Sequence, residues 1–195
     1  MSMSGTAYRA RRRTTARSDR TRARILEAVR ELLSEGTFHE STVEQVAERA
    51  GLSRATVYQH FRSRLELVDG ICDTLGDNPA LLQIRELVSD PDPGRALGET
   101  IANAVRFWAS EDTVLAQLYG VTAIDPAAQA FVDRQRADRR GTMEQLAATL
   151  GKRGALATLM VLTSYETYRE LRLAGLDDRA VTRKLQQDAQ TLLPA

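Results

Sequence analysis

Cysteine and histidine are scarce in this sequence of 195 residues, which contains one cysteine, Cys72, and two histidines, His39 and His60. A single thiol cannot form a disulfide within the chain, and structural zinc sites built from Cys and His use four such ligands. We therefore expect no internal disulfide and no metal site. Cys72 is expected to pack inside a helix, with redox sensing as the alternative role.

Long apolar runs are also absent. The longest uncharged apolar stretch, residues 154–165, has 12 residues and includes two threonines and a serine. It is too short to span a bilayer, and the Arg-rich N-terminus lacks the apolar stretch of a secretory signal. The sequence predicts a soluble, cytoplasmic protein without a membrane partner.

Patterns typical of enzymes are missing as well. The sequence has no Gly-rich phosphate-binding loop, no paired-histidine metal motif and no supported Ser-His-Asp arrangement. We expect neither catalytic residues nor a cofactor.

Net charge is small, because 27 basic residues face 26 acidic residues and leave a formal charge of only +1. By itself this value disfavours a nucleic-acid partner. The distribution points the other way. Residues 1–64 contain 13 arginines and 7 acidic residues, a net charge of +6, whereas residues 65–195 contain 14 basic and 19 acidic residues, a net charge of −5. A basic N-terminal third indicates a polyanionic partner at that end of the chain.

Proline is missing from residues 1–78 and occurs five times in the whole chain. Apolar residues follow a helical spacing nearly throughout, and no alternating strand pattern persists. The predicted fold class is therefore all-α. Pro and Gly positions predict helix breaks at Asn78-Pro79, at residues 90–94, at Asp125-Pro126, at Gly151 and at Gly175.

Residues 1–18 are rich in Arg, Ser and Thr and lack apolar periodicity, which predicts a flexible Arg-rich arm. The first helix is expected to start near Arg20 and to end at Gly36. The arm has two possible roles, a contact with phosphates or a minor groove, or a solvated tail. Its arginines are Arg9, Arg11, Arg12, Arg13 and Arg17.

Residues 41–61, STVEQVAERAGLSRATVYQHF, predict two short helices joined by a tight turn. Ser41 with Glu44, or Thr42 with Gln45, fits a capping box at the start of the first helix. Gly51 suits the positive backbone torsion of a tight turn. This spacing is typical of a helix-turn-helix.

The second helix of this segment has an apolar inner face, with Val57 and Phe61, and a polar outer face. Arg and Gln can bond the edges of guanine and adenine, and hydroxyls and His can reach bases or phosphates. The pattern is typical of a recognition helix that enters the major groove. The alternative is a helical hairpin with a solvated polar face. The outward residues are Ser53, Arg54, Thr56, Tyr58, Gln59 and His60.

The run from Thr42 to Leu67, TVEQVAERAGLSRATVYQHFRSRLEL, closely resembles the N-terminal signature of the tetracycline-repressor (TetR) family of bacterial transcriptional regulators. The upstream helix, from Arg22 to Phe38, is similar to the first helix of that family. The resemblance covers about residues 20–70.

This resemblance implies an N-terminal three-helix helix-turn-helix domain joined through a fourth helix to a C-terminal helical bundle. The expected division is an arm over residues 1–18, a DNA-binding domain over 19–66, and a ligand-binding and dimerisation domain over 67–195. The implied function is that of a repressor, which releases a palindromic double-stranded DNA operator when a small-molecule effector binds. The alternative is a helical adaptor whose basic N-terminal face binds an acidic protein.

The resemblance also implies individual contacts. Thr42 is expected to contact a phosphate at the start of the second helix, and Tyr58 to do so through its hydroxyl. Arg64 stands where the family usually has Lys, and Arg binds phosphate through two hydrogen bonds.

Two apolar stripes near the C-terminus are candidates for a homodimer interface, because the family commonly pairs its last two helices with those of a second copy. Both stripes also suit the core of a single copy. They comprise Leu156, Leu159, Met160, Thr163, Thr167 and Leu171 within residues 154–174, and Val181, Leu185, Ala189 and Leu192 within residues 178–193.

An effector site is expected between the middle helices, because small-molecule sites often lie inside helical bundles. Aromatic and Met residues are its candidate walls, although each of them also suits an ordinary core. They are Phe107, Trp108, Tyr119, Phe131, Met143, Met160, Tyr165 and Tyr168.

Overall fold

The chain is helical throughout its described parts, so the predicted all-α fold is confirmed. The computed structural model describes residues 5–124 and 126–193, with the backbone alone for residues 5–15, 121–124, 126–128, 131 and 153. Among the described residues, no helix combines the length and the apolar composition that a bilayer-spanning segment needs. In chain order the elements are α1 (Gly5–Ser34), η1 (Phe38–Glu40), α2 (Val43–Arg49), α3 (Arg54–His60), α4 (Arg64–Gly76), α5 (Pro79–Leu87), α6 (Pro93–Ile124), α7 (Pro126–Thr149), η2 (Arg153–Ala155), α8 (Leu156–Leu162), α9 (Tyr165–Leu173) and α10 (Asp178–Leu192), where η marks a 3-10 helix.

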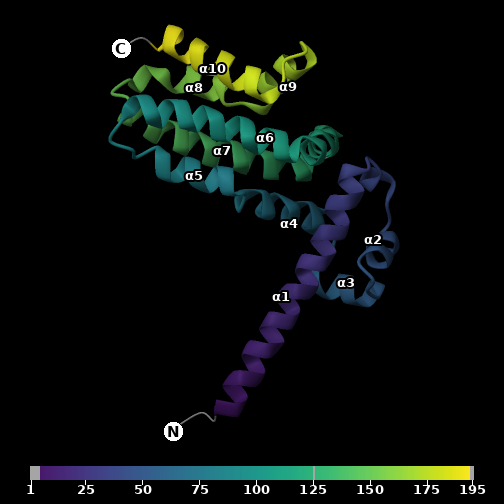
Figure 1. The fold of residues 1–195 in the computed structure, drawn as a ribbon. Coiled ribbons are helices and arrows are strands. Elements are labelled where there is room, and N and C mark those ends of the chain that lie inside the picture. The colour runs from purple at the N-terminus through teal and green to yellow at the C-terminus, as the bar shows by residue number, and fades with distance from the viewer. Residues whose placement is uncertain (1–4, 125, 194–195) are drawn as a thin grey trace.

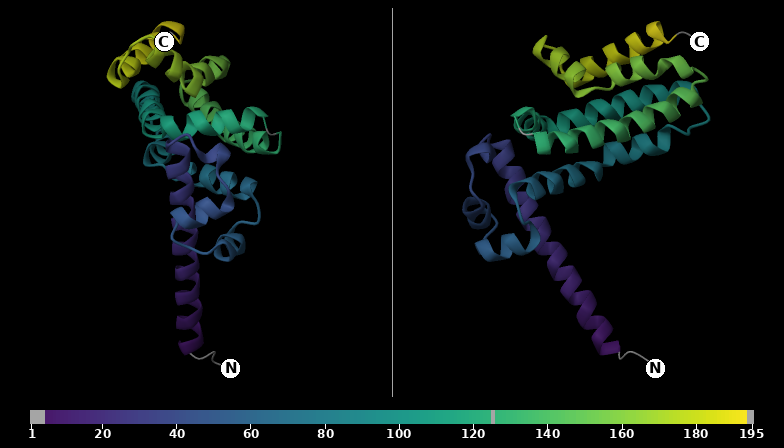
Figure 2. Two further views of the ribbon diagram at one scale, coloured as in Figure 1. Left: turned by 90° about the vertical axis from the view of Figure 1, so that its right-hand side faces the viewer. Right: turned by 180° about the vertical axis from the view of Figure 1, so that it is seen from behind.

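The helices form two parts (Figure 1). The C-terminal half of α1 packs beside α2, α3 and α4, while its N-terminal half extends away from the other helices in every view of Figures 1 and 2. The second part is layered, with α6 and α7 between α5 on one side and the C-terminal helices α8 to α10 on the other (Figure 1). Helix α4 leads from the first part to the second.

Helix α1 begins earlier than the sequence pattern predicts. It starts at Gly5 and not near Arg20, so the predicted start of the first helix is wrong. Residues 5–18 of the predicted arm are part of α1, and residues 1–4 lie outside the described residues. Ala and Arg are strong helix formers, and a helix already held by packing extends at little cost per residue. Residues that form no apolar face can therefore still be helical. The predicted end of the helix is confirmed, because Gly36 follows it with φ of +73°.

The first part has its own apolar core beneath α1. Ile25, Val29 and Leu33 of α1 are each 0% exposed. They face Val46 and Ala47 of α2 and other buried side chains of the same core. Burying a side chain of this size contributes about 1.5–3 kcal/mol, so the core holds the short helices α2 and α3 at fixed angles to α1.

The predicted break points of the second part agree with the helix starts. Asn78 caps α5, which begins at Pro79, and α6 and α7 begin at Pro93 and Pro126. One prediction is wrong, because residues 154–174 form two helices and not one. Ser164 accepts a hydrogen bond from the amide of Thr167 and starts α9, and Ser and Thr side chains compete in this way with continuous helical bonding.

An ion pair connects the two parts. Arg30 of α1 donates through Nη1 to a carboxylate oxygen of Glu111 in α6. The other oxygen of Glu111 accepts from the side-chain amide of Asn78, at 3.1 Å. Glu111 is only 7% exposed, so this carboxylate fixes α1 and the start of α5 against the long helix α6.

Candidate nucleic-acid interface and ligand cavity

The first helix of the predicted helix-turn-helix starts at Thr42. Its hydroxyl accepts a hydrogen bond from the amide of Gln45 at 3.3 Å, and the Gln45 side chain accepts one from the amide of Thr42 at 2.8 Å. Of the two capping boxes that the sequence allows, the structure contains this one. The hydroxyl of Ser41 instead donates to the carbonyl of Thr37. Thr42 is exposed at the N-terminus of α2, which is where a helix favours a phosphate.

The turn between α2 and α3 depends on Gly51, whose φ of +62° confirms the predicted positive torsion. The amide of Leu52 then donates to the carbonyl of Ala47 at 2.8 Å and closes the turn. Arg24 of α1 donates to the carbonyl of Ala50 at 2.7 Å. A side chain of the long helix therefore holds the turn in place.

Helix α3 is short and is fixed at its two ends and on one face. Ser53 accepts from the amide of Thr56 at 3.1 Å and starts the helix. Ser63 caps α4 immediately afterwards by accepting from the amide of Glu66 at 3.2 Å. On the inner face, Val57 and Phe61 are 0% and 2% exposed. The opposite face of α3 is therefore held outward.

The structure brings the predicted contact residues together around this outward face. Thr42, Ser53, Arg54, Tyr58 and Gln59 are exposed, and Thr56, His60 and Arg64 are half-buried. Among the described residues, Tyr58 is the one large hydrophobic side chain exposed on this face. The face is therefore mainly polar.

Arg54 already has partners in the free chain. Its guanidinium forms an ion pair with Glu44 of α2 and lies 5.3 Å from the centre of the Tyr58 ring. Its pKa is raised, first by a hydrogen bond with Tyr58 and then by the charge of Glu44. To bind a base or a phosphate, Arg54 would have to leave the carboxylate of Glu44. This costs little free energy, because exposed ion pairs are weak.

Arg64 points partly inward, which the sequence does not indicate. One guanidinium nitrogen donates to the carbonyl of Ser41 at 2.7 Å, and the other donates to the carbonyl of Phe38. The guanidinium lies 4.2 Å from the centre of the Phe38 ring, and its burial lowers the pKa. The contact between Arg64 and a phosphate stays a prediction. In the structure, the two hydrogen bonds of Arg64 connect α4 to the segment before α2.

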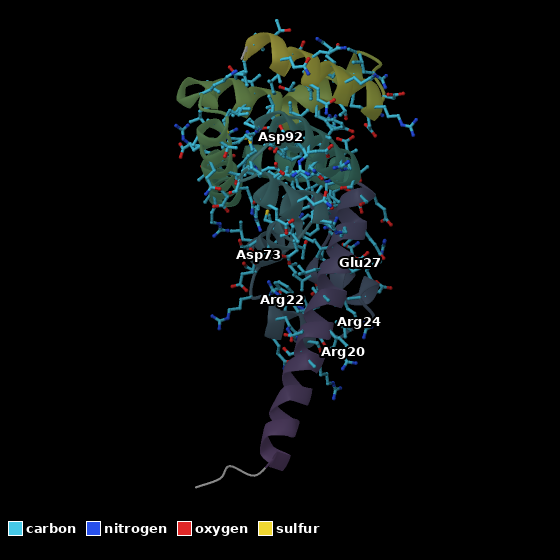
Figure 3. The ribbon with its side chains drawn as sticks, turned by 60° about the vertical axis from the view of Figure 1, so that its left-hand side comes forward. Arg20, Arg22, Arg24, Glu27, Asp73 and Asp92 are labelled. Atoms are coloured by element: carbon cyan, nitrogen blue, oxygen red, sulfur yellow. The ribbon has the colours of Figure 1, made fainter. Side chains whose placement is uncertain are left out.

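Two arginines of α1 also border this interface and were missed. Arg24 holds the turn, and Arg22 lies over the Phe61 ring at 4.4 Å and 3.9 Å from the carboxylate of Asp73. Figure 3 shows Arg20, Arg22 and Arg24 along the same stretch of α1. The sequence run Arg20-Thr21-Arg22-Ala23-Arg24 could have indicated these two arginines. It lies between the predicted arm and the helix-turn-helix, where no contact residues were predicted.

Residues 25–71, which hold the C-terminal part of α1 and all of α2, α3 and most of α4, match the family model for bacterial regulatory proteins of the tetR family. The described residues outside this range are mostly helical as well, and the fold is similar to that of a solved transcriptional regulator.

Residues 25–71 are a tetR-family domain.

Named relatives match this chain over part of its length. It is 35% identical over 60 residues to the HTH-type transcriptional regulator SrpR of Pseudomonas putida, which is 31% of this chain and 28% of that protein. It is 32% identical over 83 residues to the HTH-type transcriptional regulator TtgR, also of Pseudomonas putida, which is 42% of this chain and 40% of that protein. The chain thus matches less than half the length of either relative.

Solved structures resemble nearly the whole chain in fold. A transcriptional regulator of Rhodococcus sp. RHA1 aligns with a TM-score of 0.72 at 20% identity, over 88% of this chain and 95% of that one. A TetR-family transcriptional regulator of Syntrophomonas wolfei aligns with a TM-score of 0.74 at 11% identity, over 89% of this chain and 95% of that one. At these identities the likeness establishes the fold alone.

The second part of the chain contains a cavity of about 150 Å³. Its walls come from α4, α5, α6, α7 and α9, and Thr163 between α8 and α9 also borders it. Leu75 of α4 and Ile84 of α5 lie on its boundary. Because Leu75 belongs to the helix that follows the helix-turn-helix, the cavity reaches the connection between the two parts.

The predicted wall residues are placed unevenly. Phe107, Trp108, Tyr119, Met143 and Tyr165 border the cavity. Met160 and Tyr168 do not, and the Tyr168 hydroxyl instead donates to Asp178 at 3.0 Å. The side chain of Phe131 lies outside the described residues. Sequence reasoning missed Thr100 and Arg139, since no helical pattern shows which single polar residue turns inward. It predicted that Cys72 packs inside but not that Cys72 borders the cavity.

Cys72 is buried against this cavity in α4. Burial, together with the charges of Asp69 and Asp73, raises the pKa of its thiol to about 11. The thiol is therefore protonated at neutral pH, which suits a packing role and disfavours redox sensing.

Proposed function

We propose that this chain, with its tetR-family domain, is a sequence-specific DNA-binding transcriptional regulator. It acts in the cytoplasm as a homodimeric repressor that releases a palindromic operator when a small-molecule effector binds. The observation that supports it most directly is the exposed polar face of α3, fixed by the Gly51 turn and by the Ser53 and Ser63 caps. The names of the relatives SrpR and TtgR agree with it.

The proposed contacts divide into two kinds. Arg54 and Gln59 read base edges in the major groove, where Arg pairs with guanine and Gln with adenine. Thr42, Tyr58 and Arg64 contact phosphates and position the helix without selecting the sequence. The remaining outward residues, Ser53, Thr56 and His60, reach either bases or phosphates.

We assign a separate role to each of the two parts of the fold. Residues 19–66 bind DNA, residues 67–195 bind the effector and form the dimer, and the helical residues 5–18 extend the basic surface. An effector in the cavity would contact Leu75 in α4. A shift of α4 changes the separation of the two recognition helices, which must match half-sites spaced at multiples of about 34–36 Å.

The residues of the two predicted stripes are buried to different extents within one copy of the chain. Leu159, Val181, Leu185 and Ala189 are at most 2% exposed within one copy of the chain and leave nothing for a partner to contact. Leu192 of the second predicted stripe is 59% exposed, and two further apolar side chains of the last helices, Val161 and Leu173, are 60% and 73% exposed. We assign the dimer contact to these exposed side chains, because a second copy would remove them from water.

A dimer test compares charge introduced at exposed apolar positions of different helices. Leu173→Asp combined with Val161→Asp should shift the chain toward monomer in sedimentation equilibrium and weaken operator binding. Leu82→Asp, at a leucine of α5 that is 43% exposed, is the matched control and should leave the dimer intact. Equal behaviour of the two variants would remove the assignment.

The test of DNA binding uses fluorescence anisotropy with a duplex from the region upstream of the chain's own gene and a random duplex as competitor. Tyr58→Phe should weaken binding to both duplexes equally. Gln59→Ala should lose about 1–3 kcal/mol of discrimination between them. Gln83→Ala, at an exposed glutamine of α5, should change neither. Binding that does not distinguish the duplexes would instead favour a basic adaptor for acidic partners.

A further inference from the structure

The cavity is long and narrow. Its residues on α6 run from Thr100 to Tyr119, which corresponds to about 28 Å of helix axis at 1.5 Å per residue. Its volume is nevertheless only about 150 Å³. Most of its walls are apolar, with Ile84, Phe107 and Leu115 among them. This shape suits a slim apolar chain better than a compact ring system.

One cation of this cavity, Arg139, forms no ion pair among the described residues, although the charge of Glu166 acts on it. Arg139 of α7 donates through Nη1 to the carbonyl of Met160 at 2.9 Å and to the hydroxyl of Thr163 at 3.3 Å. Burial lowers the pKa of its guanidinium. A desolvated guanidinium binds a carboxylate strongly and with defined geometry.

The other charged residues on the boundary are exposed. They are Arg85, Arg136, Asp138 and Glu166. Their charges are open to solvent and therefore screened. Arg139 is the charged side chain of this cavity that combines partial burial with fixed hydrogen bonds.

A second polar group lies at the other end. Thr100 is 0% exposed, borders the cavity, and its hydroxyl has no hydrogen-bond partner among the described residues. A buried polar group without a partner is costly, and a ligand that supplies one removes the cost.

Trp108 of α6 connects the two polar groups along the wall. It donates through its indole nitrogen to the carbonyl of Thr163, and Arg139 donates to the hydroxyl of the same residue. Thr100 precedes Trp108 by about 12 Å of helix axis, and the wall between them is apolar, with Ala104 and Phe107.

We propose that the cavity binds an extended amphipathic carboxylate. Its carboxylate pairs with Arg139, its apolar chain lies along α6, and a hydroxyl or carbonyl near the far end pairs with Thr100. That this carboxylate is the effector rests on the proposed function. That the cavity binds it does not depend on DNA binding.

The test is titration calorimetry on the full chain without DNA, with octanoate, its uncharged isostere octanamide, and 8-hydroxyoctanoate. Octanoate should bind at least about tenfold more tightly than octanamide, as expected for a charge-assisted pair. The added hydroxyl of 8-hydroxyoctanoate should tighten binding further. Equal affinity for octanoate and octanamide, or no binding of either acid at millimolar concentration, overturns the inference.

Variants assign the two contacts. Arg139→Met should abolish the preference for octanoate over octanamide, while Arg140→Met, at an exposed neighbour that does not border the cavity, should retain it. If Arg139→Met does not fold, Arg139→Lys replaces it and should reduce the preference, because an ammonium lacks the two-pronged geometry. Thr100→Val should bind octanoate at least as well and should lose the preference for the hydroxylated acid. An unchanged preference in either variant contradicts that contact.

The operator experiment separates this inference from the proposed function. Specific DNA binding together with no preference for octanoate overturns the ligand class and leaves the regulator intact. A preference for octanoate in a chain that does not bind DNA supports the ligand class and overturns the regulator.

Discussion

Several side chains of the candidate interface have intramolecular partners that restrict what they offer to DNA. Arg54 pairs with Glu44, and Arg64 donates to the carbonyls of Ser41 and Phe38. These contacts hold long side chains near the positions in which they would meet phosphates or bases. Some of the ordering entropy of binding is thus already lost in the free chain.

Arg64 should be important for stability as well as for DNA. Arg64→Lys should lower the free energy of unfolding by about 1–2 kcal/mol, because one ammonium cannot replace two directed hydrogen bonds to separate carbonyls. Urea unfolding followed by circular dichroism measures the change. Arg62→Lys, at an exposed arginine two residues earlier, is the control and should have little effect. If both variants unfold at the same urea concentration, the inward contacts are unimportant.

Cys72 should be chemically inert in the folded chain. Its pKa is raised from 9.0 to about 11, so at pH 8 the thiolate is about 100-fold rarer than for an unshifted thiol. A disulfide reagent should therefore react slowly with the native chain and rapidly after unfolding in urea. Fast reaction of the native protein at pH 8 would contradict the burial of this thiol.

At the scale of elements, the turn between α2 and α3 tolerates little change. Gly51→Ala should destabilise the chain by about 1–2 kcal/mol, because an L-residue with a side chain is strained at positive φ. The added Cβ would also lie 3.1 Å from Nη2 of Arg24, which holds the turn. Gly141→Ala in α7 meets no atom within 4 Å and should be neutral or stabilising. Thermal melts of the two variants should therefore differ, with a lower melting temperature for Gly51→Ala alone.

The N-terminal half of α1 should contribute to DNA binding through charge. Deleting residues 1–17 should reduce the slope of log affinity against log salt concentration, because each lost phosphate contact releases about one counterion fewer. The measurement is operator binding at several salt concentrations for the full and shortened chains. An unchanged slope would show that this helix stays in solvent.

The sequence predicts elements well where local chemistry decides them. Thr42, Gly51 and Pro79 mark their helix boundaries through capping or torsion, and the structure places the boundaries there. The inward contacts of Arg64 escaped prediction because its partners are backbone carbonyls 23 and 26 residues away. Apolar spacing likewise could not distinguish walls of a cavity from ordinary core.

At the scale of the whole molecule, the ion pair of Arg30 and Glu111 joins the two parts. Glu111→Gln should lower the free energy of unfolding by about 2 kcal/mol, because it leaves Arg30 without its carboxylate in a largely buried site. Glu99→Gln is the matched control on the same helix, since its pair with Arg106 has side chains 51% and 56% exposed. Equal stability of the two variants in urea would show that the joint between the parts lies elsewhere.

Helix α3 spans only Arg54–His60, and isolated helices shorter than about 12–15 residues are marginal in water. Its outward face exists only while the surrounding core is intact. A genetic screen for loss of the proposed repression should consequently recover substitutions at buried positions such as Val57 and Val29 alongside those at the proposed contact residues. The amount of folded protein in each mutant, measured by immunoblot, would tell the two groups apart, because core mutants lose abundance and contact mutants keep it.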